Sequence, residues 1–467
     1  MSGTEFGVLD SDELRPFHRK VTLLSAAGMF LDGYDLAVIA VALPVLKKQW
    51  DISAGWEGAL AASAVVGMLV GALVFGRLTD RLGRKKMYLI DLICFFVFAA
   101  LTAVSQDLWQ LLAFRFLLGV GLGADYSISS TLLAEFAPAH RRGTLMCRLG
   151  ATWFVGSAAA YLAGLVFSPL GDSSWRWMLL LGAVFALVVI YLRSKIPESP
   201  RWLQARGRAD EASAVLARFT RATGEADEPG DAAHRVSEAE EHAPFRRLFS
   251  GRMLRWTTFC CGFWFMYTLA YYGITIYTPT IMKEFTTNSL ESSIGSMVVA
   301  LLGVAGAVAG VATVDRVGRR PLIITAFSGL VVALAVLALI PSPPLAAVVV
   351  LLAVAVLFAN SGPGILDFVY PTELFPTPLR ASGTGLAAAV SRAGGVIGTL
   401  LFPKLVDAWG LGNALWLFVA CGVLGVGICV WLAPETKGER LEDINRRLIG
   451  ADELDSLRAE ATARPAG

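Results

Sequence analysis

The chain has 467 residues, of which 55% are hydrophobic and only 17% are charged, and its mean hydropathy is +0.60. A soluble protein of this length has far more charged surface, so the composition excludes a soluble globular enzyme or binding module. Forty basic and 38 acidic residues give a net charge of +2, a balance that gives no reason to expect a nucleic-acid partner.

Apolar windows of about 20 residues, the length that crosses a bilayer as a helix, organise the chain. Twelve of them follow one another, near residues 21–46, 57–77, 87–105, 108–137, 143–168, 176–194, 254–281, 292–314, 321–341, 345–371, 382–408 and 412–433. We therefore expect an all-α membrane protein with twelve transmembrane helices in two six-helix bundles. Its expected parts are an N-terminal tail (1–20), a first bundle (21–194), a central loop (195–252), a second bundle (253–433) and a C-terminal tail (434–467).

Basic residues indicate how the chain is oriented in the membrane. They gather in the loops on one side, at Arg77, Arg81, Arg84, Lys85, Lys86, Arg141, Arg142, Arg316, Arg319, Arg320 and Arg380, whereas loops on the other side, such as 168–174, carry almost none. The positive-inside rule then places both tails and the central loop in the cytoplasm. We expect a monomer in the inner membrane of a bacterium.

The two halves share three sequence motifs. GRLTDRLGRKK at 76–86 recurs as VATVDRVGRRP at 311–321, which places Asp80 and Asp315 at an offset of 235 residues. AEFAPAHRRGT recurs loosely as TELFPTPLRASGT, and IPESPRW recurs as APETKGE, with offsets of 238 and 237 between their glutamates. Nearly equal offsets indicate parallel duplication of a six-helix unit, which transporters use to build a binding site at the bilayer midplane.

These motifs resemble the major facilitator superfamily over nearly the whole chain, and the duplicated D-R-x-G-R-[KR] loop is highly specific for it. PESPRWL at 197–203 and YPTELFPTPLRASGTG at 370–385 resemble its sugar-porter and organic-ion-transporter branches. DGYD at 32–35 and GLGADYSIS at 121–129 are similar to proton-coupled phosphate symporters. SRAGGVIG at 391–398 is similar to the eleventh span of organic-anion and nicotinate-type transporters. The resemblance implies two pseudo-symmetric bundles that work by alternating access.

Two carboxylates lie inside the first predicted span, in FLDGYDLAVIAVALP at 30–44. Asp32 and Asp35 are three residues apart and occupy neighbouring positions of one helix face. Charge at that depth usually faces a bundle interior or a water-filled cavity, so we expect this helix to line a transport pathway. All four histidines lie outside the predicted spans, which favours a carboxylate, Asp35 before Asp32, as the proton-binding group. Hydrogen bonding at a helix end or between helices is the structural alternative.

The fourth predicted span contributes two further charges, Arg115 and Asp125, in RFLLGVGLGADYSISS. The resemblance to proton-coupled relatives implies that Arg115 takes part in proton transfer, and the alternative is an ion pair on the cytosolic side. In phosphate symporters the aspartate that matches Asp125 is part of the proton and substrate path, and Tyr126 adds a hydroxyl beside it. In the fifth span we expect Arg148 and Trp153 at the cavity, with snorkelling and core packing as the respective alternatives.

Aromatic side chains dominate the seventh predicted span, CCGFWFMYTLAYYGITIY. Ring faces shape a pocket and hydroxyls orient a polar substrate, so four of its residues are candidate substrate contacts: Trp264, Tyr267, Tyr271 and Tyr272. Phosphate symporters carry an aspartate four residues after this tryptophan, where this chain has Thr268, so inorganic phosphate is disfavoured.

Three polar residues in spans ten and eleven complete the candidate substrate site. Asn360 and Asp367 lie in ANSGPGILDFVYPTE, where Gly362, Pro363 and Gly364 predict a bend. Sugar porters typically carry an aromatic residue near the position of Asp367, which we take as counting against a sugar. Arg392 lies more than two turns from either end of its span, and organic-anion transporters have an arginine at this motif position. A guanidinium pairs bidentately with a carboxylate, and a structural pair with Asp367 is the alternative.

Charged residues of the cytosol-side loops resemble the family's network of salt bridges between helices. The resemblance implies a latch that holds the cytoplasmic gate shut in the outward-open state without touching substrate. The set consists of Asp80, Arg84, Glu135, Arg142, Glu198, Asp315, Arg319, Glu373, Arg380 and Glu435.

Together these patterns favour a proton-coupled importer of a small organic anion, an aromatic or other monocarboxylate. The alternatives within transport are phosphate, a neutral sugar or polyol, and drug efflux, and from another class a membrane sensor that does not transport. The six cysteines lack metal-ligand spacing, and the spans show no nucleotide loop or nucleophile elbow. We therefore expect no cofactor, no metal and no enzymatic activity.

Overall fold

The computed structural model describes residues 16–82, 84–136, 142–193, 208, 210, 211, 214, 243–439 and 441–462. Inside these ranges it does not describe the side chains of 16–21, 73–82, 84, 85, 88, 124–136, 142–144, 377, 441, 442, 458, 459, 461 and 462. The predicted domain boundaries at 20, 194, 252 and 433 remain predictions.

The predicted windows of the first half each coincide with one long helix. These helices are α1 (Pro16–Trp50), α2 (Ala54–Leu82), α3 (Arg84–Ala103), α4 (Leu108–Phe136), α5 (Arg142–Phe167) and α6 (Ser174–Arg193), with a short 3-10 helix, η2 (Ser168–Ser173), between the last two. Their boundaries lie within a few residues of the predicted ones, because the charged and turn-forming residues that bound each apolar run also bound each helix.

In the second half, two of the six predicted spans are broken helices. The elements are α9 (Met253–Thr275), α10 (Thr278–Phe285), α11 (Ser289–Val317), α12 (Arg319–Leu339), α13 (Leu345–Ser361), α14 (Pro363–Leu374), α15 (Thr377–Trp409) and α16 (Leu411–Leu432). A 3-10 helix, η4 (Phe245–Phe249), precedes them, and α17 (Leu441–Ile449) and α18 (Ala451–Thr462) follow.

By length and apolarity alone, eight helical stretches of the described residues are able to span a membrane, and nine if the bent pair α9–α10 is one span. The stretch 145–193 combines α5 and α6, while α3 and α4 contribute the shorter apolar stretches 89–103 and 108–123. The chain is thus an all-helical, multi-pass membrane protein, as its composition predicts.

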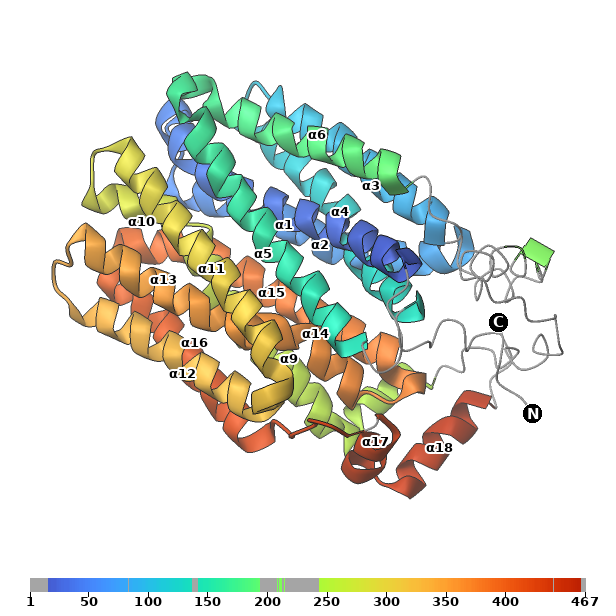
Figure 1. Ribbon diagram of the computed structural model, residues 1–467. Coiled ribbons are helices and arrows are strands. Elements are labelled where there is room, and N and C mark those ends of the chain that lie inside the picture. Colours follow the sequence, from blue (N-terminus) through green and yellow to red (C-terminus); the bar gives the residue numbers. More distant parts are fainter. Residues whose placement is uncertain are drawn as a thin grey trace.

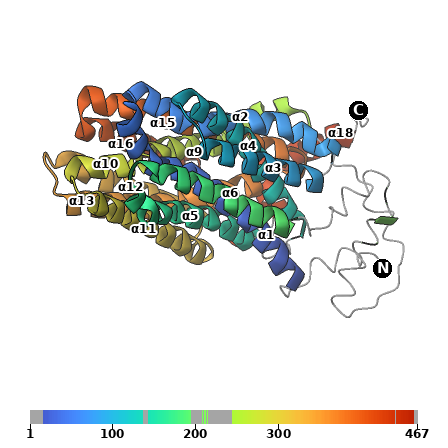
Figure 2. The ribbon, with the colours of Figure 1, turned by 90° about the horizontal axis from the view of Figure 1, so that it is seen from above.

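The helices form two bundles that lie side by side, α1–α6 in blue to green and α9–α16 in yellow-green to red (Figures 1 and 2). Within the first bundle α1 packs on α5, α2 on α4, and α3 on α6; within the second, α9 packs on α15, α11 on α13, and α12 on α16. Each contact of one bundle has its counterpart six spans later. The predicted pseudo-symmetric pair of six-helix bundles is therefore confirmed.

Glycines allow the helix pairs next to the bundle interface to approach with their backbones in contact. A Cβ on Gly33 would lie 1.9 Å from the carbonyl oxygen of Trp153, and one on Gly156 would lie 2.0 Å from that of Phe30, so α1 and α5 have no space for a side chain there. In the second bundle, a Cβ on Gly398 would lie 2.1 Å from the carbonyl oxygen of Leu269, which joins α15 to α9 in the same way.

The two bundles contact each other mainly at the end opposite α17 and α18. There α2 packs on α15, α1 on α10, and α5 on α11. A Cβ on Gly58 would lie 3.1 Å from the carbonyl oxygen of Leu400, and the hydroxyl of Tyr161 on α5 donates to the carbonyl of Thr275 on α9 at 2.6 Å. The interface is thus closed at this end.

Candidate functional site

A cavity lies midway along the helices, between the two bundles. About 420 Å³ of empty space, including the part continuous with solvent, is bounded by residues of α1, α5, α9, α14 and α15. The lining residues are Met29, Gly150, Trp153, Phe154, Trp264, Tyr267, Thr268, Tyr271, Tyr272, Gly364, Asp367, Phe368 and Arg392. This position, at the interface of the two repeats, is where transporters of duplicated architecture place substrate.

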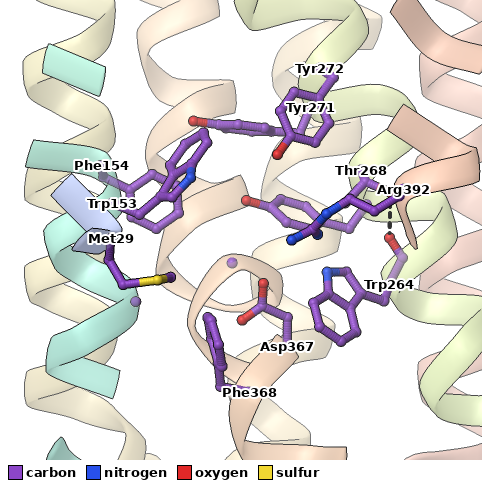
Figure 3. Close-up of a pocket in the computed structure, with 13 residues that line it drawn as sticks. Met29, Trp153, Phe154, Trp264, Thr268, Tyr271, Tyr272, Asp367, Phe368 and Arg392 are labelled. Atoms are coloured by element: carbon purple, nitrogen blue, oxygen red, sulfur yellow. Dashed lines mark hydrogen bonds between the residues drawn. The ribbon is translucent and has the colours of Figure 1, made fainter. Parts of the chain in front are cut away.

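Seven aromatic residues form most of the cavity wall, and Figure 3 shows the rings of Trp153, Phe154, Trp264, Tyr271, Tyr272 and Phe368 around one space. The rings of Trp153 and Tyr271 meet across the bundle interface with centroids 6.1 Å apart, and those of Phe154 and Tyr271 do so at the same distance. The rings of Tyr267 and Tyr271, one turn apart on α9, have their centroids 5.3 Å apart. Such walls bury apolar ring or chain surface, while a few polar groups fix orientation.

Two oppositely charged residues, Arg392 on α15 and Asp367 on α14, lie on this aromatic wall. Each is 8% exposed. One guanidinium nitrogen of Arg392 donates to the hydroxyl of Ser391 at 3.2 Å. Figure 3 shows the carboxylate of Asp367 and the guanidinium of Arg392 turned towards the same space, and no ion pair joins these two described residues. The structure therefore brings both predicted residues to the cavity without forming the alternative structural pair.

Buried hydrogen bonds position the polar residues around the cavity. Thr268 donates to the carbonyl of Ser391 at 2.6 Å, which ties α9 to α15 directly beside Arg392. The hydroxyl of Tyr267 donates to the side-chain oxygen of Asn360 at 3.4 Å, and the amide of Asn360 donates to the carbonyl of Gly303 at 3.1 Å. Asn360 thus orients a cavity-lining tyrosine and does not itself line the cavity.

Asp35 forms a buried pair with Arg115. One guanidinium nitrogen of Arg115 donates to Oδ1 of Asp35 at 3.3 Å, and the other donates to its backbone carbonyl at 3.2 Å. Arg115 is 0% exposed and Asp35 is 3% exposed. The charged partner of Asp35 therefore lies within its own bundle. Because α4 begins at the end opposite α18, the pair lies towards that end.

The other predicted residues of the first bundle differ in their placement. Asp32 is buried, at 1% exposure, and Tyr272 on the cavity wall is within its electrostatic reach. Arg148 is exposed and is not among the lining residues, because its position on α5 directs it away from the cavity. Asp125 and Tyr126 lie on α4, but their side chains are outside the described residues.

Some of the charged loop residues predicted to form a latch contact one another in the second bundle, while their role as a latch remains a prediction. Arg319 pairs with Asp315 at 3.0 Å and with Glu373 at 3.3 Å. The carboxylate of Glu435 accepts hydrogen bonds from the backbone N–H groups of Arg319 and Arg320, each at 3.0 Å. Arg380 donates to the carbonyl of Phe375 at 3.3 Å. The side chains of Asp80, Arg84, Glu135 and Arg142, and all of Glu198, are outside the described residues.

Several lining residues were not predicted from the sequence. Met29, Phe154 and Phe368 resemble lipid-facing or core residues in any apolar run, and only their packing assigns them to the cavity. Phe368 bears on the substrate, because it provides an aromatic ring directly beside Asp367. This ring weakens the argument against a sugar, which relied on the lack of such a residue.

Comparison with known proteins gives a consistent set of matches. A family model described as "Sugar (and other) transporter" matches residues 21–448. The inner membrane metabolite transport protein YgcS of Escherichia coli is 35% identical over 432 residues, which cover 92% of this chain and 94% of that protein. The niacin transporter NiaP of Acinetobacter baylyi is 28% identical over 430 residues, which cover 92% and 96%. The solved structure of the proton:xylose symporter XylE bound to 6-bromo-6-deoxy-D-glucose has a TM-score of 0.74 at 24% identity, covering 94% of this chain and 99% of that one.

Proposed function

Because this chain belongs to the sugar (and other) transporter family, we propose that it imports a small organic anion, a monocarboxylate, together with protons. The observation that carries the proposal is the position of Arg392, a guanidinium at 8% exposure on the wall of an aromatic cavity between the bundles. A buried guanidinium is costly unless an anion or a hydrogen-bond acceptor compensates it, and a carboxylate matches its paired donors. The rings would enclose the body of the substrate.

The pair of Asp35 and Arg115 supports the proton-coupling part of the proposal. The second carboxylate oxygen of Asp35, Oδ2, has no hydrogen-bond partner within the described part of the chain, so it is free to take up a proton. Protonation would weaken the contact with Arg115 and so change how α1 packs on α4. Asp32 lies closer to the cavity, within electrostatic reach of Tyr272, and would link the two sites.

The contacts between the two bundles support the proposal of alternating access. The interface is closed at the end opposite α18 by α2 against α15 and by the hydrogen bond from Tyr161 to Thr275. Basic residues at the α18 end, such as Arg316, Arg320 and Lys437, favour the cytoplasm for that end. The proposal therefore includes a monomer in a bacterial inner membrane, whose cavity is cut off from the outside in this conformation.

A neutral sugar or polyol is the second candidate substrate. Phe368 beside Asp367 and the hydroxyls of Tyr267, Tyr271 and Tyr272 favour it, because sugars bind to ring faces and to hydrogen-bonding groups. The description of the family and the xylose symporter among the similar structures support the same candidate.

Uptake into proteoliposomes tests substrate class. Monocarboxylates, sugars, polyols and phosphate are offered separately to the wild type and to the Arg392→Ala variant. We expect accumulation of a monocarboxylate and a loss of at least tenfold in Arg392→Ala. Accumulation of a sugar that Arg392→Ala leaves unchanged would establish the second candidate. Binding without accumulation of any solute would point to a sensor.

Coupling is tested with the same vesicles. We expect uptake to follow an inward proton gradient and a protonophore to abolish accumulation. The Asp35→Asn variant should still exchange substrate across the membrane, because exchange needs no net proton movement, but should not accumulate it. Full accumulation by Asp35→Asn, with no effect of the protonophore, would refute proton coupling.

A further inference from the structure

Asp367 has an unmet hydrogen-bonding requirement inside the cavity. The residue is 8% exposed, and its Oδ1 has no hydrogen-bond partner among the described residues. An unsatisfied buried acceptor destabilises the folded protein, and a charged one does so more strongly. Buried groups of this kind call for an explanation, and here the carboxylate faces a space that a ligand is able to fill.

The arrangement around Asp367 is polarised. The carboxylate on α14 and the guanidinium of Arg392 on α15 are turned towards one space (Figure 3), yet no ion pair joins them. At a largely buried site, two opposite charges that form no ion pair with each other favour a molecule that carries both complementary charges. A simple anion would satisfy Arg392 and would be repelled by an ionised Asp367.

Aromatic faces flank the carboxylate. Figure 3 shows Asp367 between the rings of Trp264 and Phe368, whose centroids are 6.4 Å apart. Gly364, one turn before Phe368, keeps the space open, because a Cβ there would lie 2.5 Å from the hydroxyl of Tyr267 and 2.9 Å from the ring of Phe154. Aromatic faces attract cations, and quaternary nitrogen in particular.

We propose that the substrate is a zwitterion, whose carboxylate binds Arg392 and whose cationic nitrogen lies against Asp367 and the faces of Trp264 and Phe368. The carboxylate half rests on the proposed function, whereas the cationic half rests on Asp367 and its rings. Such a molecule places a complementary charge beside each of the two residues, which offsets part of the cost of removing its own charges from water.

Four compounds with one ring test the two halves separately. Pyridine-3-carboxylate is an anion, N-methylpyridinium-3-carboxylate a zwitterion, N-methylpyridinium-3-carboxamide a cation, and pyridine-3-carboxamide neutral. Their dissociation constants are measured on the purified wild type by calorimetry or by thermal shift. We expect the zwitterion to bind at least tenfold tighter than the anion, and the cation to bind tighter than the neutral amide. An anion that binds as well as the zwitterion would overturn the proposal.

Variants assign each preference to its residue. In Asp367→Asn the affinity for the zwitterion, divided by the affinity for the anion, should fall to about one or below. In Asp367→Glu most of the wild-type preference for the zwitterion should be restored. Asp407→Asn, which removes the same charge at an exposed position of α15, should keep the wild-type ratio. If Asp367→Asn also keeps that ratio, the assignment to Asp367 is refuted. Arg392→Gln should lower the affinity for the two compounds that carry a carboxylate and leave the affinity for the two carboxamides unchanged. If the affinity for neither carboxylate falls, the proposed function is refuted. The comparison of the two carboxamides still tests Asp367 in that case.

Discussion

The guanidinium of Arg115 on α4 donates to two oxygens of Asp35 on α1, to the side-chain Oδ1 at 3.3 Å and to the backbone carbonyl at 3.2 Å. The two residues are 80 positions apart in the chain. Both are almost fully buried, so the pair is a fixed element of the first bundle and also the charge that protonation would alter.

Removing one partner of this pair should be far more harmful than removing both. Arg115→Leu leaves a buried carboxylate without its partner, and such losses cost about 3–5 kcal/mol. We expect the double variant Arg115→Leu/Asp35→Asn to recover most of that loss in the free energy of unfolding. Thermal or denaturant unfolding in detergent measures the stability of the single and of the double variant. Additive effects of the two single changes would show that the contact contributes nothing.

The glycine contacts between α1 and α5 predict a sharp difference between two alanine substitutions. Gly33→Ala should destabilise the protein by at least about 1–3 kcal/mol, because the added Cβ would overlap the backbone of α5. Gly427→Ala on α16, where no atom lies within 4 Å of the added Cβ, should be neutral or stabilising by up to about 1 kcal/mol. The unfolding midpoints of the two variants are measured and compared. Equal midpoints would contradict the packing of α1 on α5 described above.

Two tyrosine hydroxyls distinguish contacts across the interface from contacts within a bundle. Tyr161 donates to Thr275 across the interface at 2.6 Å, whereas Tyr34 donates to Met178 within the first bundle at 2.7 Å. A hydrogen bond contributes about 1 kcal/mol, which is about fivefold in an equilibrium constant. We therefore expect Tyr161→Phe to increase opening at this end about fivefold and Tyr34→Phe to leave opening unchanged.

Opening is measured by labelling a cysteine at position 29, on the cavity wall, with a membrane-impermeant maleimide. The six native cysteines are first replaced by alanine. If Tyr34→Phe and Tyr161→Phe accelerate labelling equally, the contact from Tyr161 does not close this end.

The hydrogen bonds to the carboxylate of Glu435 lead us to expect that the stability of the protein depends on pH. Burial alone would raise the pKa of Glu435, but backbone N–H groups of Arg319, Lys437, Arg320 and Thr436 donate to the carboxylate, and the net effect lowers its pKa below the usual 4.5. A lowered pKa in the folded state means that the ionised carboxylate stabilises the protein above that usual value. This contribution is lost as the pH falls through the lowered pKa.

We therefore expect Glu435→Gln to lower the unfolding midpoint at pH 7, and the difference from the wild type to shrink below pH 4.5. Glu439→Gln serves as the control, because Glu439 forms a half-exposed pair with Arg447 at 3.0 Å, and exposed pairs contribute about 0–1 kcal/mol. A difference for Glu435→Gln that stays constant into acid would rule out the role of the carboxylate charge.

Much of the fold was predictable because membrane helices are defined by long apolar runs. The bend at Gly362 and Pro363 was also predicted, and α13 ends at Ser361 with α14 beginning at Pro363. The break between α9 and α10, which bends the chain by 45°, was missed, although Pro279 near the start of α10 was a signal for it.

The site was predictable where polarity is unusual for its depth. Arg392, Asp367 and the tyrosines of α9 were identified because charged and hydroxyl groups are rare in a span. The partner of Asp35 was not identified, because hydropathy does not tell which faces of α1 and α4 meet. Phe154 and Met29 were missed for a related reason: an apolar side chain facing a cavity has the same sequence signature as one facing lipid.

The backbone contacts at Gly33 and Gly398 determine how the cavity is able to change its width. At these glycines the backbones of α1 and α5 meet without an intervening side chain, and so do those of α9 and α15. We therefore expect each pair of helices to move as one rigid unit, so that the distance between the two pairs depends on the length of the bound molecule. A longer homologue of the substrate, with the same charged ends, should hold the two pairs apart and act as a competitive inhibitor that is not itself transported.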